Sequence, residues 1–335
     1  MNPLSCQTER RTRPCHYGPN RERYIPRVRK ARAWLPWLVT CAFVLGLLAY
    51  GTISYRVADG LTRPERKPLD PPAASVASVY EDVSFRSSDG LLLKGWWFPT
   101  KDADRAVVVV HGRAANRINS SFQPQKIAQF FLANRYSVLL FDLRAHGESE
   151  GLRYTLGQDE PRDILAAIDF AQQRAAVARR RVAVVAESMG GGSAIMTVGA
   201  DPTIGPVVTD SAYADVGVVL SEVLTSYTGL PSWFNPGIVL DARLFMGIDV
   251  TRIKPADVVR AHPERAWLFV QCDNDHTVFP HHGTDLKNAS ANPDTELWMV
   301  HGCEHVRAFT TQTVEWERRV LAFLDRELAR TRPAG

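Results

Sequence analysis

A serine at the end of an apolar run is the residue best placed for nucleophilic chemistry. Residues 181–187 form a β-branched run, Ser188 follows it, and three glycines and a helix-favouring segment come next. A strand–turn–helix corner of this kind projects its serine outward, and small neighbours let the backbone bend and a substrate approach. Ala186 stands where the G-x-S-x-G pattern has its first glycine. Ser188 is therefore a predicted nucleophile, and a flexible glycine-rich loop is the alternative.

Carboxylates and histidines follow the last two predicted strands. Asp273 and Asp275 come after the next-to-last strand. His301 lies at the end of the last strand, and His305 follows it. A serine hydroxyl needs a base to take its proton and a carboxylate to orient that base. Because ligands bind beyond the carboxyl ends of strands in open parallel sheets, we expect serine, acid and base to meet at one edge.

The elements that position these residues alternate between strands and helices. Ser88-Asp89-Gly90 predicts a hairpin between the first two strands. The alternation that follows predicts an α/β fold with a doubly wound, mostly parallel sheet covered on both faces. The predicted strands are 81–86, 91–98, 106–110, 137–141, the run before Ser188, 205–209, 266–270 and 296–300, and the predicted helices are 125–134, 159–174, 188–200, 282–291 and 306–328.

The alternation is interrupted between residues 213 and 262. This segment is rich in aromatic residues and prolines and does not resemble a single helix. An insertion of about fifty residues in a compact domain is usually functional, so we predict a cap over the site. A pair of helices packed on the sheet edge is the alternative. The domain as a whole is predicted to span residues 79–332.

From about residue 79 onward, the chain resembles the α/β-hydrolase superfamily, in particular its serine-esterase-like and acyl-peptidase-like members. The order Ser, Asp, His along the chain is the order of that superfamily. The matching strings are His111-Gly112, residues 142–149 (Asp-Leu-Arg-Ala-His-Gly-Glu-Ser), the Ser188 corner, residues 275–280 (Asp-His-Thr-Val-Phe-Pro) and residues 302–305 (Gly-Cys-Glu-His).

The resemblance implies a role for particular acids and bases. Asp275 would be the acid because it precedes a Val-x-Pro segment, with Asp273 and Asp210 as alternatives. His305 would be the base because it completes a Gly-x-x-His arrangement, with His301 as the alternative. The resemblance thus implies the catalytic set Ser188, Asp275 and His305.

Two backbone N–H groups would form the oxyanion hole, those of Arg113 and Met189. This chemistry requires no metal ion or organic cofactor. His276, His281 and His282 lie near Asp275 in the sequence, but the set of ligands that would complete a metal site is missing, and we expect none.

The five cysteines show no C-x-x-C spacing. Cys272 and Cys303 lie beside the acid and base loops that the resemblance implies. If the last two strands are neighbours and the domain is extracytoplasmic, a disulfide between these two residues would tie the loops together.

An uncharged stretch near the amino terminus predicts a membrane helix. Residues 33–53 carry no charged side chain, and about 20 helical residues span a bilayer core. Tryptophans and tyrosines near the two ends suit the two interfaces. We therefore predict one membrane-spanning helix over residues 33–55. A cleaved signal peptide is the alternative, with a poor cleavage site at Ala49-Tyr50-Gly51.

The charge distribution predicts the topology. Nine basic and two acidic residues lie within residues 1–32, so the positive-inside rule places this tail in the cytoplasm and the large domain outside the membrane. The formal charge of the chain is +4, which leaves the remainder slightly acidic. Nucleic acid is therefore not an expected partner. Prolines in residues 56–78 predict an extended linker.

Together these features predict a membrane-anchored serine hydrolase. It would cleave an ester, thioester or amide of a small-molecule or lipid-like acyl substrate through an acyl-enzyme on Ser188, with carboxylester chemistry favoured over peptidase chemistry. Acyl transfer or peptidase action on the same triad is one alternative. A non-catalytic binding domain displayed at the membrane is another. The sequence indicates no oligomeric state.

Overall fold

The structure is a computed structural model that describes residues 28–330, with side chains from Trp34 onward. The chain divides into two units, Met1–Ala49 and Tyr50–Gly335. The second unit contains the sheet, the cap and all the predicted site residues.

Helix α1 (Val28–Thr62) is longer at both ends than the predicted span of residues 33–55. Its segment Trp34–Thr62 is long and apolar enough to cross a bilayer, with a mean hydropathy of 1.8 in its most apolar window. The side chains of residues 34–49 are exposed. A signal sequence near the amino terminus passes the same test of length and composition. The helix is therefore a candidate span.

The predicted extended linker over residues 56–78 is wrong in its first part. Its first turns continue α1, which ends two residues before Pro64 because the residue preceding a proline disfavours helix. The remainder is not a free tether. Arg66 donates hydrogen bonds to three carbonyl oxygens of the domain, and Ala73 and Val76 are buried in its core. The segment thus packs on the domain.

Eight strands form one sheet in the order β1-β2-β4-β3-β5-β6-β7-β8. The pairs β1–β2 and β2–β4 are antiparallel and the others are parallel, which confirms the predicted hairpin and the mostly parallel α/β sheet. The strands are β1 (Glu81–Arg86), β2 (Leu92–Phe98), β3 (Ala106–Val110), β4 (Ser137–Phe141), β5 (Val182–Glu187), β6 (Val207–Asp210), β7 (Leu268–Cys272) and β8 (Glu296–Val300).

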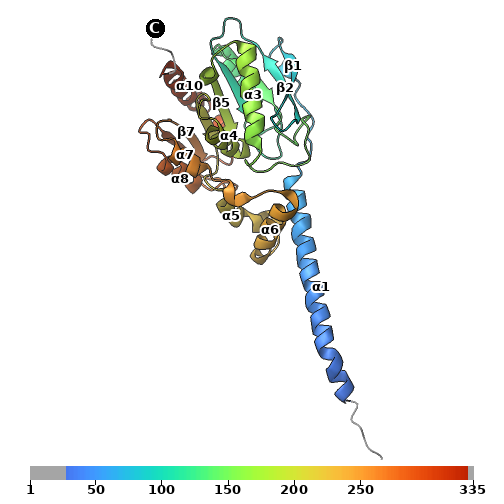
Figure 1. The fold of residues 1–335 in the computed structure, drawn as a ribbon. Helices are drawn as coiled ribbons and strands as arrows, with labels where there is room; N and C mark the ends of the chain where they lie inside the picture. The colour runs from blue at the N-terminus through green and yellow to red at the C-terminus, as the bar shows by residue number, and fades with distance from the viewer. Residues whose placement is uncertain (1–27, 331–335) are drawn as a thin grey trace, which may run out of the picture. The chain divides into compact units, whose positions relative to one another are not determined.

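Helices cover both faces of the sheet, because its central strands are apolar on both sides. Val107 and Val109 of β3 belong to one buried cluster, and Val108 and Val110 belong to the other. Helices α2, α9 and α10 cover the first face, and α3, α4, α7 and α8 cover the second (Figure 1). These helices are α2 (Pro124–Ala133), α3 (Glu160–Ala175), α4 (Ser188–Ala200), α7 (Pro255–Ala261), α8 (His281–Ala289), α9 (Ala308–Thr311) and α10 (Thr313–Arg330).

The predicted cap over residues 213–262 lies between β6 and β7, but its last part is wrong, because α7 packs against α4 and the sheet instead. Figure 1 shows its helices α5 and α6 set apart from the layered sheet. Beneath them, a third apolar cluster joins Ala58 of α1 to Leu224 of α5 and Ile238 of α6. The end of α1 is therefore built into the cap. The cap elements are α5 (Val216–Thr228), α6 (Asn235–Met246) and short 3₁₀ turns at Ser232–Phe234 and Val250–Arg252.

Candidate active site

Ser188 lies at the corner between β5 and α4. All six residues of β5 are buried in the sheet, and the backbone of Ser188 has a φ of 48°, in the left-handed region that non-glycine residues rarely adopt. A Cβ at Gly190 would clash with two carbonyl oxygens at the end of β3, and one at Gly192 would clash with the ring of Tyr213. These glycines allow α4 to approach β3 and the cap. The corner presents Ser188 to a cavity beneath the cap.

A continuous chain of hydrogen bonds leads away from Ser188. Nε2 of His305 lies 2.9 Å from Ser188 Oγ, and Nδ1 of His305 lies 2.6 Å from Asp275 Oδ2. The buried Asp275 also accepts the backbone N–H groups of Thr277 and Val278, at 2.8 and 2.9 Å. These N–H groups fix the carboxylate opposite Nδ1. The structure thus brings together the three residues that the resemblance implies.

Two of the alternative residues form a separate pair on the surface. Asp273 Oδ2 lies 3.0 Å from His301 Nδ1. The side chain of His301 is 84% exposed, and Asp273 also accepts the N–H of Gly302. No contact joins this pair to Ser188 among the described residues. Asp273 and His301 therefore stabilise the turn after β8.

The third alternative acid, Asp210, is buried at the end of β6. Its Oδ1 accepts a hydrogen bond from Ser211 at 3.1 Å, and its Oδ2 has no hydrogen-bond partner. Burial raises the pKa of Asp210 to about 8, and the nearby Glu187 and Asp275 carboxylates add to the effect. The carboxyl group is therefore mainly protonated at neutral pH, and Asp275 is the acid that contacts His305.

The predicted oxyanion-hole residues border the same cavity as Ser188. Arg113 and Met189 both line it. The N–H of Met189 belongs to the first turn of α4, where backbone N–H groups have no acceptor within the helix. A Cβ at Gly112 would lie 3.1 Å from the Cβ of Ser188, so the loop that carries Arg113 passes directly beside the serine. The arrangement can place two donors near an oxygen attached to the attacked carbon.

Glu187, the residue before the serine, holds this loop in position. Its Oε1 accepts the backbone N–H of Gly112 at 2.9 Å and the hydroxyl of Ser120 at 2.5 Å. Burial raises the pKa of Glu187, although both hydrogen bonds act in the opposite direction. An acceptor at position 187 thus fixes the backbone next to Arg113. Its position beside Ser188 in the sequence was the available signal, but its partners were not predictable.

Buried polar groups brace the loops that follow β3 and β4. His111 Nε2 accepts the N–H of Leu143 at 3.0 Å, and His111 Nδ1 donates to the carbonyl oxygen of Gly112 at 2.8 Å. Burial lowers the pKa of His111, which favours the neutral ring that this pattern needs. Arg117 and Asp142 form a buried ion pair at 2.6 Å. These contacts keep the loop that carries Arg113 in one conformation.

A disulfide between Cys272 and Cys303 joins the end of β7 to the loop after β8. The structure confirms this pairing, because β7 and β8 are neighbouring parallel strands with Cys272 opposite Val300. Asp275 and His305 follow the two cysteines closely in the sequence. The bond therefore ties the loop that carries Asp275 to the loop that carries His305.

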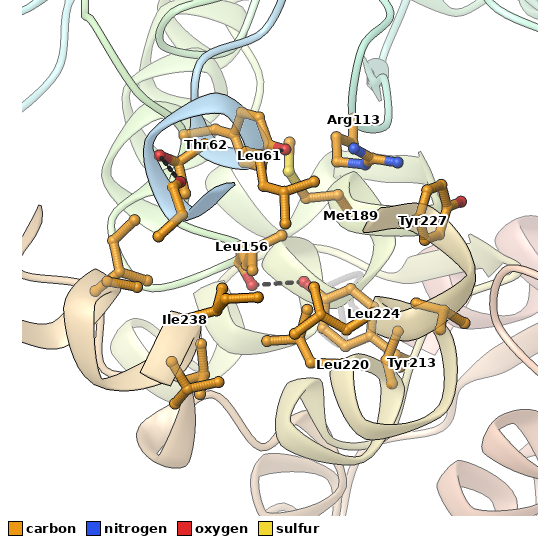
Figure 2. A pocket seen from close by; sticks show the side chains of 18 of the residues that line it. Leu61, Thr62, Arg113, Leu156, Met189, Tyr213, Leu220, Leu224, Tyr227 and Ile238 are labelled. Carbon is orange, nitrogen blue, oxygen red and sulfur yellow. Dashed lines mark hydrogen bonds between the residues drawn. The ribbon is translucent and has the colours of Figure 1, made fainter. Parts of the chain in front are cut away.

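The cavity beside Ser188 has a volume of about 120 Å³ and an almost entirely apolar lining. Figure 2 shows Leu220 and Leu224 of α5 on one side, Ile238 of α6 on another, and Leu61 of α1 above them. On the same measure of volume, one buried water molecule occupies roughly 10–15 Å³. A cavity of about 120 Å³ therefore has room for roughly ten heavy atoms of an apolar group. The Arg113 guanidinium lies over the ring of Tyr227, 4.9 Å from its centre.

The end of α1 contributes to this cavity, which the sequence pattern did not predict. Ala58, Leu61 and Thr62 line it, although residues 56–62 were predicted to be linker. Ser54, Ala58 and Thr62 are buried at four-residue intervals. This spacing places them on one helix face and was a detectable signal.

Glu222 on α5 lies against two histidines at the start of α8. Its carboxylate oxygens lie 2.6 Å from His281 Nε2 and 3.1 Å from His282 Nε2. Nδ1 of His282 accepts the N–H of Ala214 at 3.3 Å. A histidine that binds a metal through Nε2 keeps its proton on Nδ1, so this hydrogen bond opposes such a role for His282. The cluster does not include His276, and it connects the cap to the body of the domain.

Comparisons with known proteins agree with this architecture. A model of the alpha/beta hydrolase family matches residues 107–331. The uncharacterized protein YfhR of Salmonella typhi is 26% identical over 284 residues, which cover 82% of this chain and 86% of that protein. The thiohydrolase apmlB of Arthrinium phaeospermum is 29% identical over 130 residues, which cover 38% of this chain and 41% of that protein.

A solved structure shows the same fold. The Pyrococcus furiosus esterase Pf2001 superposes with a TM-score of 0.66 at 24% identity, and the match covers 80% of this chain and 98% of that chain. At this identity, the likeness concerns the fold alone.

Proposed function

Since the chain belongs to the alpha/beta hydrolase family, we propose that it is a serine hydrolase that acts on an ester, thioester or amide through an acyl-enzyme on Ser188. The hydrogen-bonded chain from Ser188 through His305 to Asp275, at the wall of an apolar cavity, carries this proposal. A nucleophile, a base and an orienting carboxylate in this order are the parts that acyl transfer to a hydroxyl requires.

The chemistry follows from these contacts. His305 Nε2 takes the hydroxyl proton as Ser188 Oγ bonds to the carbonyl carbon of the substrate. The N–H groups of Met189 and Arg113 then stabilise the negative oxygen of the tetrahedral intermediate. His305 returns the proton to the leaving group as its bond to carbon breaks, which leaves the acyl group on Ser188. Water, deprotonated by His305, attacks this ester, and His305 passes that proton to Ser188 Oγ as the acyl–oxygen bond breaks and the acid is released. Asp275 accepts a hydrogen bond from the Nδ1–H of His305 throughout and stabilises the positive charge of the imidazolium ring.

The apolar cavity favours a substrate with an apolar acyl or aryl group and an ester linkage. Its lining offers few polar groups that would pair with a peptide backbone, and leaving such groups unpaired is costly. A thioester is the second candidate, because the partial relative apmlB is named a thiohydrolase.

We also propose that α1 anchors the chain in a membrane, with the amino terminus in the cytoplasm and the catalytic unit outside. The contacts of Tyr50 support an uncleaved helix. Its hydroxyl donates to the carbonyl oxygen of Trp233 at 3.0 Å and accepts the N–H of Gly237 at 3.1 Å, and cleavage at residues 49–51 would weaken or remove them. The Cys272–Cys303 disulfide suits an oxidising compartment.

Covalent labelling tests the proposed function. The full-length chain in detergent is expected to bind one fluorophosphonate per chain, on Ser188 as mapped by mass spectrometry, because the probe reacts with activated serines. A folded chain that takes up no probe would instead favour a non-catalytic binding domain. A panel of esters, thioesters and peptides, assayed in water and with added alcohol, then separates hydrolysis, peptidase action and acyl transfer.

The end of α1 is expected to influence which acyl chains are accepted. Ala58 is buried and lines the cavity, so Ala58→Phe would fill part of the space that a longer acyl chain occupies. The variant should lower kcat/KM for octanoyl esters by at least about tenfold, while acetyl esters change little. p-Nitrophenyl esters of increasing chain length provide the measurement.

Gly60→Phe is the matched control, because Gly60 is exposed and a side chain there meets no atom within 4 Å. Equal losses for acetyl and octanoyl esters in Ala58→Phe, with an unchanged melting temperature, would contradict a role for Ala58 in the choice of acyl chain.

A further inference from the structure

Large apolar side chains are exposed along helix α6 and the short turn before it. Trp233 of that turn and Leu240, Leu244 and Phe245 of α6, here called the cap patch, are between 53% and 66% exposed. Leu240 and Leu244 lie on the face of α6 opposite Ile238 and Ala242, which line the cavity. Soluble proteins seldom expose several large apolar side chains together unless another surface covers them.

The cap patch adjoins the end of the uncharged amino-terminal stretch. The ring of Tyr50 stacks on Trp233 with a centroid distance of 5.6 Å, and Tyr55 meets Phe245 edge-on at the same distance. Tyr50 and Tyr55 are also the last aromatic residues of the proposed membrane helix. If the two tyrosines lie at the membrane interface, as aromatic residues at helix ends commonly do, their contacts bring the cap patch to the same level.

The charges near the cap patch also fit a lipid surface. Arg56 follows Tyr55 directly and is exposed, and the side chain of Arg243, on the outward face of α6, is 62% exposed. Arginines at such positions extend their guanidinium groups to lipid phosphates while their stems remain among apolar groups. Two acidic groups also border this edge, Asp249, whose carboxylate lies 3.5 Å from Arg243, and Asp241, which follows Leu240 in α6 and is partly buried.

We propose that the cap patch inserts into the outer interface of the bilayer that holds α1. This inference depends on the membrane anchor proposed above but not on the chemistry at Ser188. Only helix α6 then lies between the lipid and the cavity beside Ser188, and it carries apolar side chains toward both. A lipid bilayer is the partner that explains both the aromatic contacts to the end of the uncharged stretch and the flanking arginines.

Spin labelling of the full-length chain in liposomes tests the proposal. Cys6, Cys15 and Cys41 are changed to Ser, the Cys272–Cys303 disulfide is kept, and a nitroxide is attached to Leu244→Cys. The control label is placed at Val314→Cys, whose native side chain is 81% exposed on the body of the domain. We expect the label at position 244 to be relaxed mainly by oxygen, which concentrates in lipid, and the label at 314 mainly by a water-soluble nickel chelate.

Each other outcome contradicts the proposal in a different way. Equal exposure of both labels to the nickel chelate means that the cap patch is in water, although the chain is anchored. Protection of position 244 from both reagents, with spin–spin broadening, means that a second copy covers α6. A chain that does not float with the liposomes contradicts the anchor as well. Fluorophosphonate labelling of the same sample reports separately on the proposed hydrolase activity.

Discussion

Ser188→Ala is expected to lower kcat for ester hydrolysis by about 10⁴- to 10⁶-fold, with little change in folding. The substitution removes the oxygen that lies 2.9 Å from His305 Nε2, so no acyl-enzyme can form. The cavity and the backbone N–H groups remain, and they account for the small residual rate. Initial rates on p-nitrophenyl esters, with the melting temperature measured in parallel, provide the test.

Ser193→Ala is the matched control for this effect, because Ser193 lies in the same helix and its hydroxyl donates to the carbonyl oxygen of Met189. It is expected to lose less than about tenfold in kcat, because a neutral hydrogen bond contributes about 1 kcal/mol. A Ser188→Ala variant that keeps more than a tenth of the wild-type rate would exclude Ser188 as the nucleophile.

Asp275→Asn is expected to lower kcat by about 10⁴-fold, the loss that follows when a histidine base is held in the wrong tautomer. The oxygen of an asparagine at 275 can still accept the N–H groups of Thr277 and Val278. Its amide nitrogen would then face His305 Nδ1 and donate to it. The ring proton would move to Nε2, where it prevents removal of the proton from Ser188.

Asp210→Asn provides the comparison that decides which acid acts. Because the pKa of Asp210 is raised to about 8 by burial, asparagine reproduces the neutral group present at pH 7. We expect a loss of less than about tenfold in kcat, in line with one altered neutral hydrogen bond. A larger loss in Asp210→Asn than in Asp275→Asn, measured on the same activated short-chain ester, would reverse the assignment.

The predictable parts of the fold and the site depend on local patterns. Ser188 and Asp275 could be singled out because each lies at or just beyond the end of a short apolar run, and the parallel sheet places such ends along one edge. The predicted ends of the strands were less accurate than their order along the chain. β7 spans Leu268–Cys272, two residues later than predicted. Apolar character alone does not show which residues have hydrogen-bonding partners on the neighbouring strand.

Contacts between distant segments account for what sequence patterns missed. The end of α1 was predicted to be linker because it carries charged residues and leads directly into a segment with four prolines. In the structure, Thr62 accepts a hydrogen bond at its hydroxyl oxygen from Arg153, which lies 91 residues further along the chain. Glu187 likewise accepts the N–H of Gly112 across 75 residues. A periodic pattern of neighbouring residues does not reveal hydrogen bonds between residues so far apart in the sequence.

The sequence by itself determined the α/β alternation, the strained serine corner and the uncharged amino-terminal stretch, because each depends on neighbouring residues and on side-chain size and polarity. The tertiary structure alone decided that Asp275, rather than Asp210 or Asp273, faces His305. It alone also made the end of α1 a wall of the cavity beside Ser188. Both outcomes depend on how separate loops and helices pack against one another, and this packing is set by the whole chain.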